Sequence, residues 1–168
     1  QSIASHSSNP SITCAKINKN YNSISAVGET VGASFILDGN QATLFGDSSE
    51  LIHSIAKDID NSKEHCHILS YIMLEDVAGK LISKALIDAT KRGVVCRLLL
   101  DCMGSKEFLN SHTCEELRNN GVHVVAALPA NILRSLLVRI DLRNHRKITV
   151  IDNSIGYMGS NNIAEASF

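Results

Sequence analysis

The spacing of apolar residues divides most of the chain into alternating helices and strands. Apolar positions at helical spacing follow Asp47-Ser48-Ser49-Glu50, which is a helix-start signal, and they recur across Val77–Arg92, where Gly93 ends the pattern. Lys106–Asn119 is predicted as a further helix. Between these helices lie short apolar runs that predict strands: His67–Leu74, Val94–Leu100 and Val122–Ala127.

Strands that alternate with helices of this length predict an α/β fold. We expect a mixed, mostly parallel sheet with helices on both faces. Towards the end of the chain, Lys147–Ile151 and Ser154–Met158 are two further predicted strands, joined by a tight turn at Asp152-Asn153. A helix is predicted to begin at Asn162. Because the sequence stops at Phe168, within that helix, we expect the native chain to continue.

The N-terminal residues differ in character from the rest. Residues 1–31 are rich in Ser and Asn and have poor periodicity, so we predict a flexible polar leader, followed by one folded domain over residues 32–168. At the start of this domain, Ser34–Leu37 and Gln41–Phe45 are predicted to form a hairpin around Asp38-Gly39-Asn40.

Composition excludes several classes of protein. With 168 residues, 44% hydrophobic and 20% charged, the chain is long and apolar enough for one folded domain. The net charge of −1 gives no global attraction to nucleic acid or anionic lipid. The five cysteines form no C-x-x-C pair, and no apolar run reaches the roughly 18 residues of a membrane span. The sequence begins at Gln1 rather than Met, so we expect a piece of a longer protein from which a membrane anchor could have been removed.

The candidate chemistry is concentrated near the C-terminal end. His145 and Lys147 are two residues apart, so on a strand they share a face, and Asp152 follows at the far end of that strand. Ser160 and Asn162 come after the next strand. A lone histidine beside basic residues is usually a surface residue. The combined spacing H-x-K-x4-D followed by G-S-x-N is much more demanding.

These side chains suit a phosphate diester. A neutral imidazole can attack phosphorus, and a lysine ammonium can hold the non-bridging oxygens as their charge redistributes. A carboxylate can orient an imidazole or stabilise its charged form. Hydroxyl and amide groups such as those of Ser160 and Asn162 can donate further hydrogen bonds to the phosphoryl oxygens.

The pattern resembles the phospholipase D superfamily, whose signature is H-x-K-x4-D. The residues on either side of the motif are similar to those of bacterial cardiolipin synthases. Asp141–Lys147 and Gly156–Ile163 carry this resemblance, which spans residues 32–168, the N-terminal half of such an enzyme. Upstream segments fall in the same order: Leu37–Asn40, Tyr71-Ile72, Ala89–Val94 and Asp101–Ser105.

The resemblance implies a fold and a reaction. The fold would be one half of a phospholipase D-like α-β-α sandwich. The reaction would condense two phosphatidylglycerol-like lipids to cardiolipin and release glycerol, through a phosphohistidine. By this analogy His145 is either the nucleophile or the acid/base, and we favour the nucleophile. Lys147 binds phosphate and Asp152 supports a motif histidine, while Ser160 and Asn162 line the phosphate site. No metal or other cofactor is implied, because lysine and histidine supply the positive charge.

The implied enzyme needs a second motif histidine, which must come from a second half of the native chain or from a homodimer partner. No other histidine in this sequence has a lysine two residues later. A phospholipid substrate implies a membrane surface. The expected location is the bacterial inner membrane, peripheral or anchored by a segment absent here, with a cytoplasmic active domain. No nucleic-acid partner is favoured.

Two further interpretations stay open. The chain could be a single-motif phosphodiesterase or nuclease that works as a homodimer, or an inactive fragment that only binds lipid or phosphate. The basic residues before the motif also have two readings: a solvated charged loop, or a funnel that attracts an anionic headgroup. They include the candidate phosphate-binding residues Arg143 and Arg146, together with Arg134 and Arg139.

Overall fold

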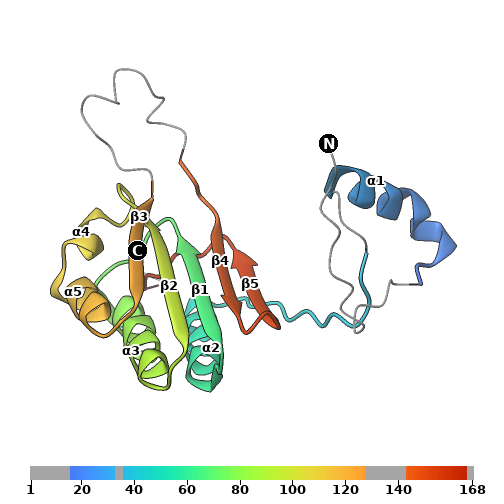
Figure 1. Cartoon of the computed structure of the whole chain (residues 1–168). Coiled ribbons are helices and arrows are strands. Elements are labelled where there is room, and N and C mark those ends of the chain that lie inside the picture. Colours follow the sequence, from blue (N-terminus) through green and yellow to red (C-terminus); the bar gives the residue numbers. More distant parts are fainter. Residues whose placement is uncertain (1–15, 33–35, 128–142, 166–168) are drawn as a thin grey trace, which may run out of the picture. The chain divides into compact units, whose positions relative to one another are not determined.

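The structure is a computed structural model that describes residues 16–32, 36–127 and 143–165. The chain divides into two compact units, Gln1–Leu44 and Phe45–Phe168, which are described one at a time. Figure 1 shows the elements of both units in chain order.

The first unit contains a short 3-10 helix, η1 (Lys19–Tyr21), and α1 (Asn22–Gly32), neither of which has a buried residue. The sequence did not predict α1, and the flexible leader over residues 1–31 stays a prediction. The expected hairpin is wrong. Gly39 turns the chain with a φ of +81°, but Gln41–Phe45 form no strand. Two isolated strands are marginal in water, and Leu44 in the second predicted strand is 97% exposed. Ser34 and Phe35 of the first predicted strand lie outside the described residues.

The second unit is built on a five-stranded mixed sheet, which confirms the predicted α/β class. Its strand order is β3-β2-β1-β4-β5. The first three strands run parallel to one another, whereas β4 is antiparallel to β1 and β5 is antiparallel to β4. Their bounds are β1 (His65–Ser70), β2 (Val95–Asp101), β3 (His123–Ala127), β4 (Lys147–Ile151) and β5 (Ile155–Gly159).

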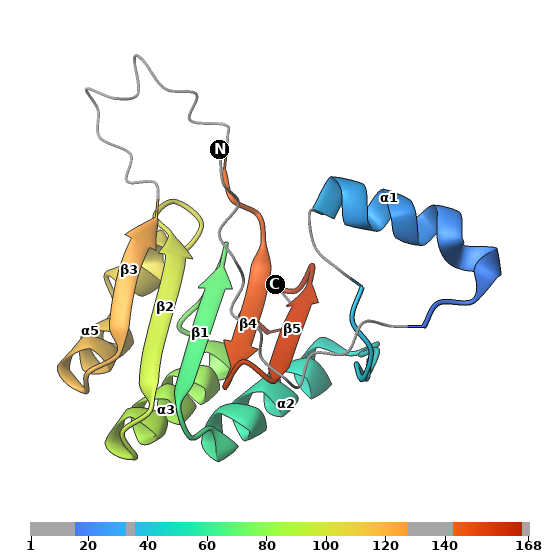
Figure 2. The same cartoon turned by 45° about the vertical axis from the view of Figure 1, so that its right-hand side comes forward.

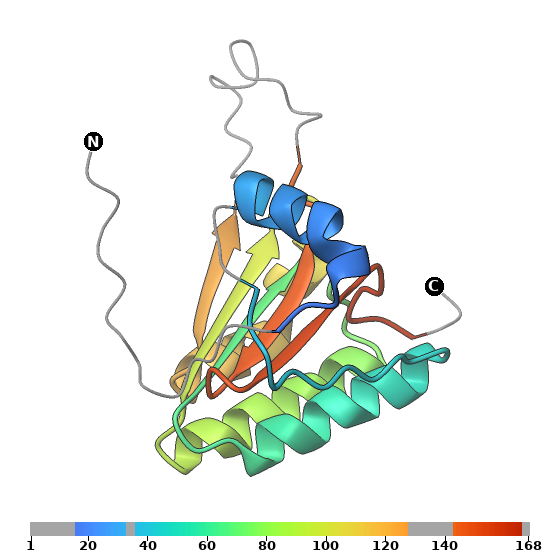
Figure 3. The same ribbon diagram turned by 90° about the vertical axis from the view of Figure 1, so that its right-hand side faces the viewer.

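The helices of this unit pack on one face of the sheet. The helix α3 (Val77–Lys91) lies between α2 (Ser48–Asn61) and α5 (His112–Asn119) and contacts β2. Figures 2 and 3 show these helices on the same side of the sheet. The sequence predicted helices on both faces. Among the described residues of this unit, the other face carries none.

Side-chain alternation along β2 explains the choice of face. Cys96, Leu98 and Leu100 point into the core beneath the helices and are buried, while the residues between them are exposed. Cys66 on β1 is the partner of Cys96 in the sheet. Burial raises the pKa of Cys66 to about 12 and that of Cys96 to about 11, so both thiols stay protonated and serve as packing groups.

Two predicted elements between residues 65 and 120 differ from the structure by more than two residues. The helix expected over Lys106–Asn119 is divided into α4 (Lys106–Leu109) and α5, because the Ser111 hydroxyl oxygen accepts a hydrogen bond from the Cys114 N–H and caps α5. The first strand ends at Ser70 rather than at Leu74. The residues after Ser70 therefore form a turn, and the candidate site lies there.

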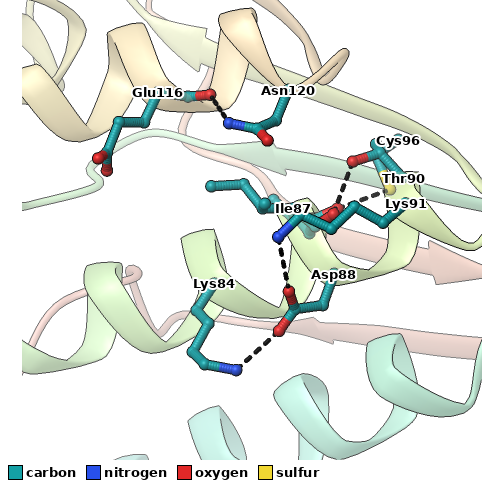
Figure 4. A network of polar contacts seen from close by, with 9 residues as sticks. Lys84, Ile87, Asp88, Thr90, Lys91, Cys96, Glu116 and Asn120 are labelled. Carbon is teal, nitrogen blue, oxygen red and sulfur yellow. Dashed lines mark hydrogen bonds and ion pairs between the residues drawn. The ribbon is translucent and has the colours of Figure 1, made fainter.

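The solvent face of α3 carries a small charge network (Figure 4). The carboxylate of Asp88 accepts from Lys84 at 2.7 Å and from Lys91 at 3.3 Å. These pairs are one helical turn apart and exposed, so solvent screens them and they contribute little to stability. The fold therefore depends on the buried layer between helices and sheet.

Candidate functional site

The candidate site lies where β1 ends and β4 begins. These strands are neighbours and run in opposite directions, so the residues after Ser70 meet the residues before Lys147 (Figure 2). The His145 imidazole stacks on the Tyr71 ring, with 4.1 Å between the ring centroids and 17° between the planes. The Lys147 ammonium lies 5.5 Å from the centroid of the same ring. Tyr71 thus links the two motif side chains.

The loop after β2 fixes the position of Tyr71. The Ser105 hydroxyl donates to the Tyr71 carbonyl oxygen at 3.0 Å and accepts from the Met73 N–H at 3.0 Å. Gly104 lies so close that an added Cβ would be 2.5 Å from the same carbonyl oxygen. The backbone at Tyr71 is therefore held by a polar contact and by close packing together.

The segment after β5 approaches the same turn. The pairing of β4 with β5 places Gly159 opposite Lys147, so Ser160 follows directly beside the motif. The Asn162 side-chain oxygen accepts from the Ile72 N–H at 3.3 Å. The sequence assigned Ser160 and Asn162 to the phosphate site. The structure brings both residues to the end of the sheet where β1 ends and β4 begins.

The helix predicted to begin at Asn162 is not formed through residue 165. Instead, Ile163 forms a parallel bridge with Met73. Its N–H donates to the Ile72 carbonyl, and its own carbonyl accepts from the Leu74 N–H, both at 3.1 Å. These backbone bonds replace a first helical turn and hold the segment against the end of β1.

Asp152 lies at the opposite end of the sheet. Its carboxylate accepts from three backbone N–H groups, those of Lys63, Glu64 and His65, each at 2.9 Å. These hydrogen bonds hold the pKa of Asp152 below its usual range. His65 begins β1 and Tyr71 follows its end, and at about 3.3 Å per residue these points are roughly 20 Å apart.

Asp152 therefore does not contact the imidazole of His145, and its support of a motif histidine stays a prediction. The two residues flank opposite ends of β4, which separates them along the sheet. Asp152 and Asn153 both have positive φ, 50° and 54°, and together make the tight turn predicted between β4 and β5. The aspartate joins this turn to the start of β1, which fixes the strand that carries the motif.

The two predicted phosphate-binding arginines differ in environment. The Arg143 guanidinium lies 3.4 Å from the carboxylate of Asp101, and both side chains are almost fully buried. The other Asp101 oxygen accepts from the N–H groups of Met103 and Gly104. Arg143 thus stabilises the loop that holds Tyr71. Arg146 has an exposed side chain. Arg134 and Arg139 lie outside the described residues.

The described residues contain no group of three or more His, Cys, Asp or Glu side chains arranged to hold a metal ion. Among the described helices, none combines the length and the apolar character that a membrane crossing requires.

Sequence reasoning did not assign a role to Tyr71. It placed Tyr71 inside the predicted strand His67–Leu74 and included Tyr71-Ile72 among the segments that resemble the family. The available signal was the position of this aromatic residue near the end of a strand, where parallel sheets gather functional loops. Only the end of β1 at Ser70 shows that Tyr71 follows the strand and does not lie inside it.

Comparison with known proteins adds a relationship to this geometry. Residues 55–168 match the family profile described as "Cardiolipin synthase, PLD-like domain". Cardiolipin synthase A of Pectobacterium carotovorum is 40% identical over 130 residues, which cover 77% of this chain and 27% of that protein. Cardiolipin synthase A of Yersinia pseudotuberculosis is 38% identical over the same shares. The chain thus spans about a quarter of the length of these relatives.

Two solved structures are similar at lower identity. A phospholipase D family member, Nuc from Salmonella typhimurium, superposes with a TM-score of 0.47 at 22% identity, over 73% of this chain and 68% of that one. Polyphosphate kinase from Porphyromonas gingivalis has a TM-score of 0.48 at 16% identity, over 69% of this chain and 19% of that one.

Proposed function

Because this chain belongs to the family of the cardiolipin synthase, PLD-like domain, we propose that its site transfers a phosphatidyl group between phosphatidylglycerol-like lipids. Two such lipids condense to cardiolipin, and glycerol is released. The observation that supports this most directly is the convergence of His145 and Lys147 on Tyr71, beside the segment that carries Ser160 and Asn162.

The reaction has two displacements at phosphorus. In the first, an imidazole nitrogen of His145 attacks, the phosphorus–oxygen bond to glycerol breaks, and the glycerol oxygen takes a proton from a second histidine. In the second, the hydroxyl of another phosphatidylglycerol gives its proton back to that histidine and attacks, and the phosphorus–nitrogen bond breaks. The Lys147 ammonium, with Ser160 and Asn162, stabilises the non-bridging oxygens in both steps.

The second histidine comes from outside this copy of the motif. The sequence contains H-x-K once, and the chain spans 27% of the relatives it matches, so either the remainder of a longer protein or a second copy of the chain supplies the acid. The substrates are bilayer lipids, so the enzyme works at a membrane surface, for which we propose the cytoplasmic face of the bacterial inner membrane.

A test needs vesicles of phosphatidylglycerol labelled in the terminal glycerol and the protein that carries this chain. We expect cardiolipin and free glycerol in equal amounts. His145→Asn should abolish both, and Lys147→Met should lower the rate by about 100- to 1,000-fold, the usual loss for one donor to a developing oxyanion. Lys57→Met, on the exposed surface of α2, is the matched control and should keep full activity.

Other products would change the assignment. Phosphatidic acid in place of cardiolipin would make the protein a hydrolase. Full activity of His145→Asn would remove the histidine from the chemistry and overturn the proposal.

A further inference from the structure

Tyr71 contacts both motif side chains without being part of the motif. Its ring is stacked on the His145 imidazole at a centroid distance of 4.1 Å, and the Lys147 nitrogen lies 5.5 Å from the same ring centre. The angle of only 17° between the two rings means that the imidazole lies nearly parallel to the plane of Tyr71. One aromatic ring thus relates the orientation of both groups.

His145 has few other constraints on its orientation. It is exposed and precedes the first residue of β4, so no sheet pairing holds its backbone. A nucleophilic imidazole must present one nitrogen along the line of attack, and a misplacement of about 1 Å can lower a rate by about 100-fold. A flat aromatic neighbour restricts the rotation of the imidazole about its side-chain bonds and so reduces the number of unproductive orientations.

Tyr71 is itself firmly held. Its carbonyl accepts from Ser105, and Gly104 leaves no room for its backbone to move towards the β2 loop. On the other side, the Ile72 N–H donates to Asn162, and the Ser70 hydroxyl donates to the Ile72 carbonyl. The turn is therefore fixed from two loops, as a support for another side chain requires.

We propose that Tyr71 is a positioning residue for phosphatidyl transfer. Its ring sets the plane of the His145 imidazole and the place of the Lys147 ammonium before substrate binds. This inference rests on the proposed function for its kinetic consequence, but the geometric part applies to the chain alone. The ring faces provide the effect, since both stacking and the attraction of a cation belong to the aromatic face. Tyr71→Phe should therefore preserve the positioning of His145 and Lys147, and Tyr71→Leu should not.

The first test is the proton NMR spectrum of the chain. Ring protons of His145, identified by their loss in His145→Asn, should lie upfield of those of the exposed His112, because the stacked ring shields them. The upfield shift should persist in Tyr71→Phe and disappear in Tyr71→Leu. Ordinary shifts in the unsubstituted chain would overturn the proposal, and His145→Asn serves only to assign the signals.

A second variant reaches Tyr71 through its support. Gly104→Ala puts a Cβ against the Tyr71 carbonyl and should move the tyrosine, which should reduce the upfield shift of His145. The matched control is Gly46→Ala, where a Cβ meets nothing within 4 Å, and the shift should be unchanged. Equal shifts in both alanine variants would count against a tyrosine held in place by this loop.

Steady-state kinetics on phosphatidylglycerol vesicles separates positioning from binding. Tyr71→Leu should lower kcat by about 100-fold with little change in KM, whereas Tyr71→Phe should stay near the unsubstituted rate. A raised KM with unchanged kcat would make Tyr71 a substrate contact and overturn the inference. Inactivity of the complete enzyme that carries this chain would instead contradict the proposed function, and the NMR shifts would still decide the role of Tyr71.

Discussion

The carboxylate of Asp152 accepts hydrogen bonds from three consecutive backbone N–H groups, at the end of the sheet remote from His145. The motif spacing therefore combines two kinds of residue. In the proposed reaction His145 and Lys147 act on the substrate, whereas Asp152 joins the turn after β4 to the start of β1. The depressed pKa of Asp152 expresses this role, because the three donors favour the charged carboxylate.

A pH series should reveal this role of Asp152. The folded pKa is below the unfolded one, so the stabilisation is complete above the ordinary aspartate value of about 3.9 and is lost as the pH falls through the folded pKa. Asp152→Ala should lower the urea midpoint at pH 7, and its difference from the unsubstituted chain should shrink below about pH 4. Asp60→Ala, an exposed aspartate of α2, should show no such loss. A difference that does not change with pH would contradict the account.

The sequence identifies the three motif residues, but it does not show that Asp152 lies far in space from His145 and Lys147. A spacing of H-x-K places two side chains on one face of a strand, and this holds for any strand. The partners of Asp152 are the backbone N–H groups of Lys63 to His65, which are nearly ninety positions away and belong to a different strand start. The pairing of β1 with β4 determines that contact, and no local pattern encodes it.

At the scale of elements, the start of α3 shows how closely the helix layer meets the turn after β1. Gly79 lies in the first turn of α3, where an added Cβ would be 1.8 Å from the Leu74 carbonyl oxygen. Its N–H donates to Asp76, the cap of the same helix. The carboxylate of Asp76 also accepts from the Glu165 N–H at 2.7 Å. One helix start thus anchors the segments on both sides of the site.

Replacing Gly79 by alanine should therefore reverse the usual sign of the change. Alanine in a helix is normally favoured over glycine by about 1 kcal/mol. Here the clash with Leu74 should cost about 1–3 kcal/mol, as over-packing does. Urea unfolding followed by circular dichroism measures the change. Gly28→Ala in α1 has open space and should cause no loss of stability. Equal or higher stability of Gly79→Ala would show that the contact is not restrictive.

The helices and strands predicted best are those with strong local signals. Helix α2 begins at its Asp47 cap, and α3 spans nearly the whole predicted range. The predictions failed where tertiary contacts decide. Ser111 ends the first part of a continuous helical pattern, and Ser105 draws the chain after Ser70 out of the sheet by bonding to Tyr71. A serine hydroxyl can cap a helix or bond to a distant segment, and the sequence alone does not show which of the two it does.

The chain carries one copy of the motif and therefore provides one motif histidine, whereas the proposed reaction uses two. The site gathers the loops at one end of the sheet around Tyr71, yet the proposed reaction needs an acid for the departing glycerol. The chain spans 27% of the relatives it matches, and in our account the acid comes from further chain or from a second copy. In the proposed reaction, the described site is thus one half of a catalytic centre.

The chain by itself should consequently show negligible turnover of phosphatidylglycerol. Sedimentation in the same buffer distinguishes the two sources of the second histidine. A monomer without activity supports a second half in a longer protein, and an active two-fold dimer supports a second copy. Efficient turnover by a monomer would contradict the need for a second motif.

The proposed mechanism requires that His145 becomes covalently bound to the lipid phosphorus. The most direct measurement is rapid quenching of the enzyme that carries this chain with phosphatidylglycerol labelled at the phosphate, followed by peptide mapping under alkaline conditions that preserve phosphohistidine. We predict labelled phosphatidyl or phosphoryl groups on the peptide that contains His145, absent in His145→Asn. Label confined to the second motif, with His145 unmodified throughout turnover, would contradict the account.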